Sequence, residues 1–178
     1  MNDTIAEGTT MSTTDRTTPG AAGSATASHA TLRRAEPADL PGVERLLTAA
    51  GLPLAGVADA LPTFVVAEAD GTLVGVAGLE RCCDNALLRS VAVDPAWRSH
   101  GLGRALVERV IADADSAKVH ALYLLTTTAE RYFPSFGFRE VARDAVPADV
   151  RETAEFRGAC PASATVMVRP AAGISPPR

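Results

Sequence analysis

The chain has 178 residues, 47% of them hydrophobic, and a formal net charge of −4. This composition supplies enough apolar side chains for one globular domain, and its acidic balance argues against the basic surface that nucleic-acid binding requires. No apolar stretch reaches the length of about 18 residues that spans a membrane, so we expect neither a nucleic-acid nor a membrane partner. Three cysteines are too few for a disulfide framework, which favours a cytoplasmic location.

We expect the chain to divide into three parts. Residues 1–29 are rich in Thr, Ser, Ala and Gly and almost free of large apolar side chains, which predicts a disordered leader. This leader has no basic start and no apolar stretch, so it does not resemble a secretory signal. Residues 30–169 carry the apolar periodicity of a folded domain, and residues 170–178, which contain adjacent prolines, should form a flexible tail.

The first half of the domain begins with a strand and a helix. Residues 31–34 predict a short edge strand, and the helical spacing that follows predicts a helix ending before Gly51. A second short helix is expected within residues 54–61. Two β-rich runs then flank Asp70-Gly71, which is the strongest hairpin signal in the chain, so we expect two adjacent antiparallel strands.

An apolar strand, a glycine turn and a helix come next. Residues 87–93 are apolar apart from Arg89 and Ser90, which predicts a strand in the middle of the sheet. Gly101 and Gly103 then open a segment with helical spacing. The start of a helix presents amides without intrahelical partners and the positive end of the helix dipole, so this turn is suited to binding phosphate oxygens.

The composition of the turn supports a pyrophosphate site, although a plain structural turn is the alternative. Gly101 and Gly103 permit a positive φ and remove the Cβ atoms that would hold a pyrophosphate away from the backbone. The turn lacks the Lys-Ser/Thr pair of a nucleoside-triphosphate loop and the third glycine of a dinucleotide loop. Arginines at both ends can add charge-assisted contacts. The expected contacts come from Arg98, Ser99, His100, Gly101, Leu102, Gly103 and Arg104.

The rest of the domain completes an α/β pattern. Residues 121–127 form a β-rich run after a helix, so this strand should lie parallel to the strand at residues 87–93. A short helix over residues 129–136, a strand over residues 138–142 and a last strand over residues 163–169 follow. We therefore expect a single α/β domain in which a mixed sheet carries helices on both faces.

Two motifs carry a resemblance to a known family. The R-x-x-G-x-G pattern of the glycine turn, at its separation from Gly137-Phe138, resembles the acetyl-CoA loop and a later motif of the GNAT superfamily of N-acetyltransferases. The resemblance covers residues 31–169. It implies a GNAT-like, mostly antiparallel sheet whose parallel strand pair splays apart, with the pantetheine arm of acetyl-CoA in the notch between the two strands. The implied backbone contacts are Val91, Ala92 and Val93.

The sequence departs from this family at two positions. Many members place a tyrosine four residues before the Gly-Phe glycine to protonate the departing thiolate, whereas this chain has Phe133. Tyr132 is adjacent, but one helical step rotates it by about 100°, so we expect it to face elsewhere. Threonines occupy the place of an asparagine that touches the cofactor in many relatives. The resemblance thus implies cofactor contacts from Thr126, Thr128 and Phe133.

Few residues are candidates for handling the acceptor. An α-amine needs little help to react, whereas a lysine side chain needs a strong general base, so an α-amine is the simpler acceptor. Glu80, at the end of its strand, is the leading catalytic carboxylate, although a solvated edge position is the plainer explanation for it. Arg89 lies in an apolar strand beside the expected notch and needs either an ion pair or a ligand anion, so it is a candidate contact for an anionic group of the substrate.

The expected activity is transfer of an acetyl group from acetyl-CoA to a small amine. Finer similarities, including Leu88-Arg89-Ser90-Val91, resemble the small amino-acid-acetylating branch associated with arsenic resistance, which implies an amino-acid or arsinic amino-acid acceptor. Acetylation of protein N-termini or lysines and a non-catalytic acetyl-CoA-binding domain are the alternatives. A homodimer is left open.

Cys82 and Cys83 are adjacent and invite comparison with a soft-metal site. If both lie in a strand, their side chains point to opposite faces of the sheet and cannot bind one ion. If both lie in a loop, no third and fourth ligands stand nearby in the sequence. We therefore expect no metal.

Overall fold

The computed structural model describes residues 29–171. The leader up to residue 28 and the tail from residue 172 lie outside the described residues, so their expected disorder stays a prediction.

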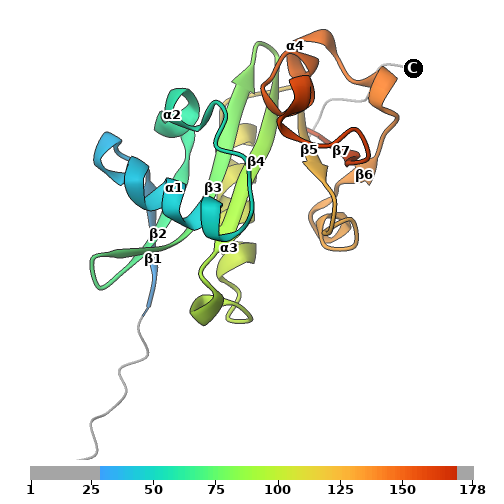
Figure 1. The fold of residues 1–178 in the computed structure, drawn as a ribbon. Helices are drawn as coiled ribbons and strands as arrows, with labels where there is room; N and C mark the ends of the chain where they lie inside the picture. Colours follow the sequence, from blue (N-terminus) through green and yellow to red (C-terminus); the bar gives the residue numbers. More distant parts are fainter. Residues whose placement is uncertain (1–28, 172–178) are drawn as a thin grey trace, which may run out of the picture.

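The described residues form one seven-stranded sheet with the order β1-β2-β3-β4-β5-β7-β6 (Figure 1). Neighbouring strands are antiparallel except for β4 and β5, which are parallel. This confirms the expected fold class. The strands are β1 (Thr31–Arg34), β2 (Val65–Ala69), β3 (Thr72–Cys82), β4 (Asn85–Val93), β5 (Ala121–Thr126), β6 (Arg139–Glu140) and β7 (Thr165–Pro170). The α-helices are α1 (Leu40–Ala49), α2 (Val57–Ala60), α3 (Leu102–Ser116) and α4 (Ala148–Arg151).

The hairpin between β2 and β3 forms where the sequence predicts it. Asp70 and Gly71 adopt φ values of 50° and 73°, which is the backbone of a two-residue turn that matches the twist of antiparallel strands. A bulge between Ala67 and Glu68 shifts the register of the hairpin once. The turn signal therefore acts locally and fixes which two strands pair.

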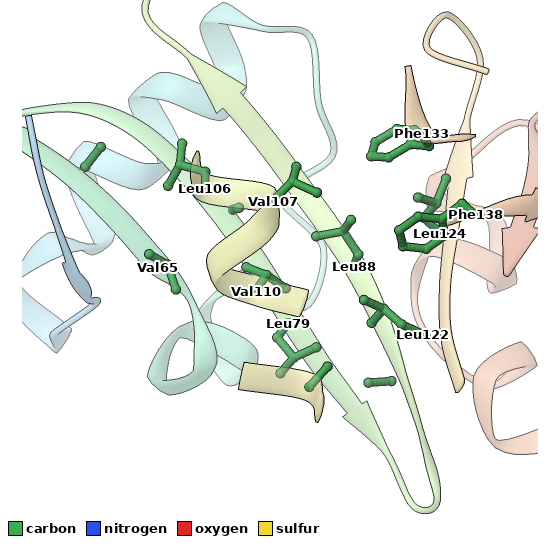
Figure 2. Packing of buried hydrophobic residues seen from close by; sticks show 14 of the residues in the cluster. Val65, Leu79, Leu88, Leu106, Val107, Val110, Leu122, Leu124, Phe133 and Phe138 are labelled. Carbon is green, nitrogen blue, oxygen red and sulfur yellow. The ribbon is translucent and has the colours of Figure 1, made fainter. Parts of the chain in front are cut away.

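Helices cover both faces of the sheet, and alternate strand residues meet different helices. Val65 of β2 belongs to the core cluster under α3, whereas Val66 belongs to the cluster under α1. Figure 2 shows Leu106, Val107 and Val110 of α3 directed at the sheet. All three side chains are fully buried, and a side chain of this kind contributes about 1.5–3 kcal/mol when removed from water.

The parallel pair of strands is short. β4 and β5 pair only at Ala86 with Leu122 and at Leu87 with Tyr123, after which the described part of the ladder ends. β5 instead pairs along its whole length with β7 on its other side. The two strands therefore diverge toward their C-terminal ends. We call the β4–β5 pair and the notch beyond it the seam of the sheet. The end of β4 at this seam leads into the glycine turn and the start of α3.

Two expected elements on the far side of the seam were wrong in type or length. Residues 130–132 form a turn, and Phe133–Phe136 is a 3₁₀ helix where a helix over residues 129–136 was expected. Pro134 explains this difference, because proline lacks the N–H that an α-helix requires and disfavours helical backbone in the preceding residue. The strand expected over residues 138–142 is only Arg139–Glu140, since the chain turns away into a short 3₁₀ helix at Arg143–Ala145.

Candidate active site

The glycine turn joins the end of β4 to α3, as the sequence predicts. The Asp94 carboxylate accepts a hydrogen bond from the Ala96 backbone N–H at 2.9 Å, which starts the turn. Gly101 precedes the first residue of α3 and has a φ of 80°. No side chain among the described residues caps this end of the helix. The first amides of α3 can therefore bind an external anion, and the helix dipole favours a negative charge there.

The two glycines of the turn have different roles, and only Gly101 uses the positive φ that glycine permits. A Cβ atom added at Gly101 would meet no atom within 4 Å, so this position needs glycine for its backbone conformation alone. Gly103 lies inside α3 and is not among the residues with a positive φ. A Cβ atom at Gly103 would lie 3.7 Å from the Tyr132 hydroxyl oxygen and 3.7 Å from Val93 Cγ2, so glycine keeps space open at the seam.

Tyr132 lies close to the glycine turn, contrary to the expectation that it faces elsewhere. That expectation assumed α-helical spacing, whereas the residue precedes a 3₁₀ helix. Its ring contacts Phe133 and Phe136 edge-on, with centroid distances of 5.4 and 5.1 Å. Burial raises the pKa of the Tyr132 hydroxyl, and the charge of Arg104 opposes this shift. Phe133 is buried against Phe138 on the same side of the seam (Figure 2).

The arginines that flank the turn have partners within the protein. Arg98 Nε donates to the Val93 carbonyl at 3.1 Å, which ties the turn to the end of β4. Arg104 pairs with Glu108 at 3.0 Å, one helical turn along α3, and its guanidinium stacks over the Phe136 ring at 4.8 Å. The bonds from Arg98 and Arg104 are exposed, and such contacts are weak enough to be exchanged for a phosphate.

The turn also borders a cavity of about 580 Å³ on the side away from the seam. His100 lines this cavity together with Trp97, Gly101 and the residues that precede β1. Ser99 has a φ of 66°, so two residues of this turn hold left-handed backbone. The sequence predicts both Ser99 and His100 as cofactor neighbours, and they lie in the turn that would cradle the pyrophosphate.

A bulge in β4 changes the direction of the strand where β5 leaves it. The register with β3 runs from Gly78 opposite Arg89 to Val76 opposite Ala92, so β4 carries one extra residue here. Ser90 has a φ of 56° within this bulge. Such bulges redirect the strand, and the amides and carbonyls of the next residues can leave the ladder on the β5 side. Those residues are Val91, Ala92 and Val93, the segment expected to pair with pantetheine.

The threonines at the end of β5 close a local turn. Thr126 Oγ1 accepts hydrogen bonds from the backbone N–H groups of Ala129 at 3.0 Å and Thr128 at 3.4 Å. This arrangement fixes how the chain leaves β5 toward Tyr132. A cofactor contact from the Thr126 hydroxyl proton is compatible with these bonds, because the oxygen acts in them only as an acceptor.

A buried charged cluster lies behind the bulge and consists of Arg89, Glu80 and Glu155. Arg89 NH1 contacts Glu80 Oε2 at 2.5 Å, and Arg89 Nε lies 3.3 Å from Glu155 Oε1. The remaining nitrogen, NH2, donates to the Ala55 carbonyl at 2.5 Å. The side chain of Arg89 is fully buried, that of Glu155 is 6% exposed and that of Glu80 is 22% exposed. The structure therefore shows the ion pair that the sequence left open for Arg89, whereas a contact between Arg89 and a substrate anion stays a prediction.

Glu155 is a residue that sequence reasoning missed. It lies in a π-helical turn (Glu155–Ala159), far along the chain from β3 and β4. Burial raises the pKa of its carboxyl group, the charge of Arg89 opposes the shift, and Glu80 adds to it. The same surroundings raise the pKa of the Cys160 thiol to about 11. The available signal was a single acidic residue between Ala154 and Phe156, which is weak without knowledge of the fold.

The other sequence candidates occupy structural positions. Cys82 is buried, and burial raises the pKa of its thiol to about 12, whereas Cys83 is exposed in the turn after β3. Within residues 29–171 no group of three or more His, Cys, Asp or Glu side chains could hold a metal ion. None of the described helices has both the length and the apolar composition needed to cross a membrane.

Comparison with known proteins agrees with this geometry. The Acetyltransferase (GNAT) domain family matches residues 61–140, which include the seam and the glycine turn. The Amino-acid acetyltransferase of Mycobacterium tuberculosis is 34% identical over 129 residues, which cover 67% of this chain and 74% of that relative.

Solved structures that bind CoA have the same fold. A Mycobacterium tuberculosis protein in complex with CoA superposes with a TM-score of 0.68 and 27% identity, over 79% of this chain and 98% of that one. The N-acetylglutamate synthase of Neisseria gonorrhoeae, complexed with coenzyme A and N-acetyl-glutamate, gives a TM-score of 0.68 and 25% identity over 79% of this chain. This chain spans only 35% of that synthase. The chain therefore belongs to the GNAT acetyltransferases and is an enzyme that takes acetyl-CoA as its co-substrate.

Proposed function

We propose that this enzyme transfers the acetyl group of acetyl-CoA to the amine of a small amino acid. The observation that supports an amino-acid acceptor most directly is the 34% identity with an Amino-acid acetyltransferase over 67% of this chain. The buried cluster of Arg89, Glu80 and Glu155 supports it as well, because Arg89 directly precedes the bulge at which β4 turns away from β5. Charged groups at such a position suit an acceptor that is itself ionised.

We assign the acetyl-CoA contacts to the glycine turn and to the two strands that border the seam. The uncapped amides of α3 suit the pyrophosphate, with Arg98 and Arg104 exchanging their present partners for it. The end of β4 suits the pantetheine amides, because its backbone groups have no ladder partner on the β5 side beyond Leu87 among the described residues. The proposed set is Val91, Ala92, Val93, Arg98, Ser99, His100, Gly101, Leu102, Gly103, Arg104, Thr126, Thr128 and Phe133.

The proposed reaction is direct attack of the amine on the thioester. The amine nitrogen forms a bond to the acetyl carbon, the amine proton passes to the Glu80 carboxylate, and the carbon–sulfur bond breaks to release CoA thiolate. A backbone amide of β4 stabilises the oxyanion that forms at the carbonyl oxygen. A thiol with an ordinary pKa near 8.5 is a fair leaving group at neutral pH, so the reaction does not require a side-chain acid.

Free-thiol release measures this function directly. We would mix the full chain with acetyl-CoA and a panel of amino acids, arsinic and phosphinic amino-acid analogues, peptides with free N-termini and a lysine-containing peptide blocked at its N-terminus. Turnover that is highest with a small amino acid supports the proposal. Turnover that is highest with the arsinic analogue would assign the enzyme to the branch linked to arsenic resistance, which the resemblance of residues 88–91 suggests.

The remaining outcomes overturn the proposal in different ways. Turnover only with peptides would identify a protein acetyltransferase. Tight binding of CoA without turnover of any amine would identify a non-catalytic acetyl-CoA-binding domain. As an internal check, Glu80→Gln should lower kcat by about 10²-fold to 10⁴-fold if Glu80 accepts the proton. An unchanged kcat would remove Glu80 from the mechanism and leave the acetyl transfer itself intact.

A further inference from the structure

Arg89 holds two carboxylates, although one would neutralise it. Its NH1 nitrogen binds Glu80 and its Nε faces Glu155, and the third side of the guanidinium is occupied by the Ala55 carbonyl. Ser90 Oγ also accepts from Nε at 3.3 Å. Every edge of the guanidinium thus has a partner, and the cluster contains one guanidinium and two carboxyl groups.

The second carboxylate is costly for the fold. Glu155 is buried, and burial disfavours its ionised form. A glutamine of the same shape could satisfy Arg89 and the neighbouring groups without burying a charge. Stability alone therefore does not explain a second buried carboxyl group, whereas an effect of its charge on Arg89 would.

The three side chains differ in their access to the outside. Glu80 is 22% exposed, whereas Glu155 is 6% exposed and Arg89 is not exposed at all. Of the two carboxyl groups, Glu80 is therefore the one that solvent reaches more readily, and under the proposed function it is the one that meets the amine. Any influence of Glu155 on the reaction passes through Arg89.

That influence has a definite direction. A guanidinium that is paired with a single carboxylate stabilises the ionised form of that carboxylate and makes the carboxylate a poor proton acceptor. A guanidinium that is shared between two carboxylates stabilises each of them less. We propose that Glu155 is a positioning residue that shares Arg89 with Glu80 and thereby leaves Glu80 able to accept the proton of the acceptor amine. This inference rests on the proposed function, in which Glu80 is that acceptor.

Charged and titratable groups from several elements act on Glu155 and its neighbour Cys160. Arg89 reaches Glu155 from β4 and Glu80 acts on it from β3, while Cys160 follows at the end of the same π-helical turn. Arg143, from the short 3₁₀ helix, acts on Cys160. Removal of the charge of Glu155 leaves these other groups in place, so its effect on Glu80 can be measured separately.

The test compares Glu155→Gln with Glu152→Gln in the full chain. Glu152 is exposed in the adjacent segment, so this control removes the same charge without altering the cluster. We would measure kcat/KM for the amine between about pH 5 and pH 9, together with KM for acetyl-CoA. Glu155→Gln should move the acid limb of the profile down by about one pH unit and lower the plateau by roughly 3-fold to 10-fold, with KM for acetyl-CoA unchanged. The control should match the parent.

A double variant separates this role from a structural one. If Glu155 acts through Glu80, then Glu155→Gln should have no further effect on kcat/KM in a Glu80→Gln background. An unchanged profile in the single variant, or equal losses in both backgrounds, would overturn the inference while the acetyltransferase activity stands. If the parent releases no CoA thiol with any amine, the proposed function fails instead.

A second substitution covers the case in which Glu155→Gln does not fold. Glu155→Asp keeps the charge but shortens the side chain by one methylene, so it should weaken the contact with Arg89 Nε and move the acid limb in the same direction by a smaller amount. A limb that stays in place or moves to higher pH would count against the inference.

Discussion

Ser90 adopts left-handed backbone in the middle of a strand, with a φ of 56°. A residue other than glycine in this region costs on the order of 1–3 kcal/mol, and such strain persists only where the surrounding structure enforces it. Here it accompanies the bulge that turns β4 away from β5, so the strain lies just before the segment that we propose to bind pantetheine.

Two substitutions of Ser90 should show whether its left-handed backbone, and not its hydroxyl group, matters for stability and for the KM of acetyl-CoA. Ser90→Val should destabilise the protein by about 1–3 kcal/mol, because a β-branched residue is strongly disfavoured at positive φ, and should raise KM for acetyl-CoA. Ser90→Gly should keep the bulge and most of the stability. Urea unfolding and KM measurements check both, and equal stability of the two variants would show that the bulge does not depend on this φ.

The buried carboxyl group of Glu155 leads to a second prediction, which concerns how the stability of the protein changes with pH. Burial raises the pKa of its carboxyl group above the ordinary 4.5, so the folded state favours the protonated form. The stability that this group contributes is therefore complete below its ordinary pKa and is lost as the pH rises through the raised one. Glu155→Gln is neutral at every pH.

The difference in Tm, parent minus Glu155→Gln, should therefore fall as the pH rises from about 4 to about 8. Thermal unfolding at a series of pH values measures it, with Glu152→Gln as the control for which the difference should stay flat. A difference that rises with pH would show that the pairing with Arg89 outweighs burial.

At the level of elements, α3 begins at the only glycine of its turn that has a positive φ, since Gly103 lies within the helix. Gly101→Ala therefore introduces backbone strain, and Gly103→Ala introduces a methyl group 3.7 Å from the Tyr132 hydroxyl and from Val93. The first variant should lose about 1 kcal/mol of stability, and the second should change stability little, because alanine is favourable in a helix.

Binding should respond in the opposite order to stability. Isothermal titration with CoA should show weaker binding for Gly103→Ala, because its methyl group enters the seam. This loss of affinity should occur although the Tm of the variant is nearly unchanged. Gly101→Ala should weaken binding only in proportion to its disturbed turn. Unchanged CoA binding in both variants would show that the turn is structural.

The elements also show where sequence reasoning succeeds. The hairpin at Asp70-Gly71 and the glycine turn before α3 are local, so their residues determine their geometry, and both were predicted. The helix expected over residues 129–136 failed because Pro134 outweighed the apolar spacing. The partners of Arg89 could not be predicted, because Glu155 reaches it only after β5, β6 and α4 have been placed.

At the scale of the molecule, the sheet consists of two blocks joined at the seam. One block holds β1 to β4 with α1, α2 and α3, and the other holds β5, β6 and β7 (Figure 1). Helix α4 packs against β4, where Asn85 donates to Asp149. The direct strand pairing between the two blocks is limited to two residue pairs. Leu88, Leu122 and Phe138 belong to one core cluster, which spans the seam and supplements this pairing (Figure 2).

A ligand that bridges the seam should stabilise the whole domain. CoA at about 100 times its Kd should add about 2.7 kcal/mol, which for a domain of this size raises Tm by roughly 5–10 °C. Thermal unfolding with and without CoA measures this shift. A control ligand, adenosine, lacks the pyrophosphate and pantetheine and should give little shift, and equal shifts for both would place binding away from the seam.

The seam has a further consequence for the protein before it meets its co-substrate. The end of β4 and the facing side of β5 amount to an internal pair of unpaired edges, and such edges accept strands from other chains. Pantetheine in the notch would occupy the donors and acceptors that a foreign strand needs. We therefore expect bound acetyl-CoA to shield these edges, so light scattering should detect more self-association of the protein without CoA than with it.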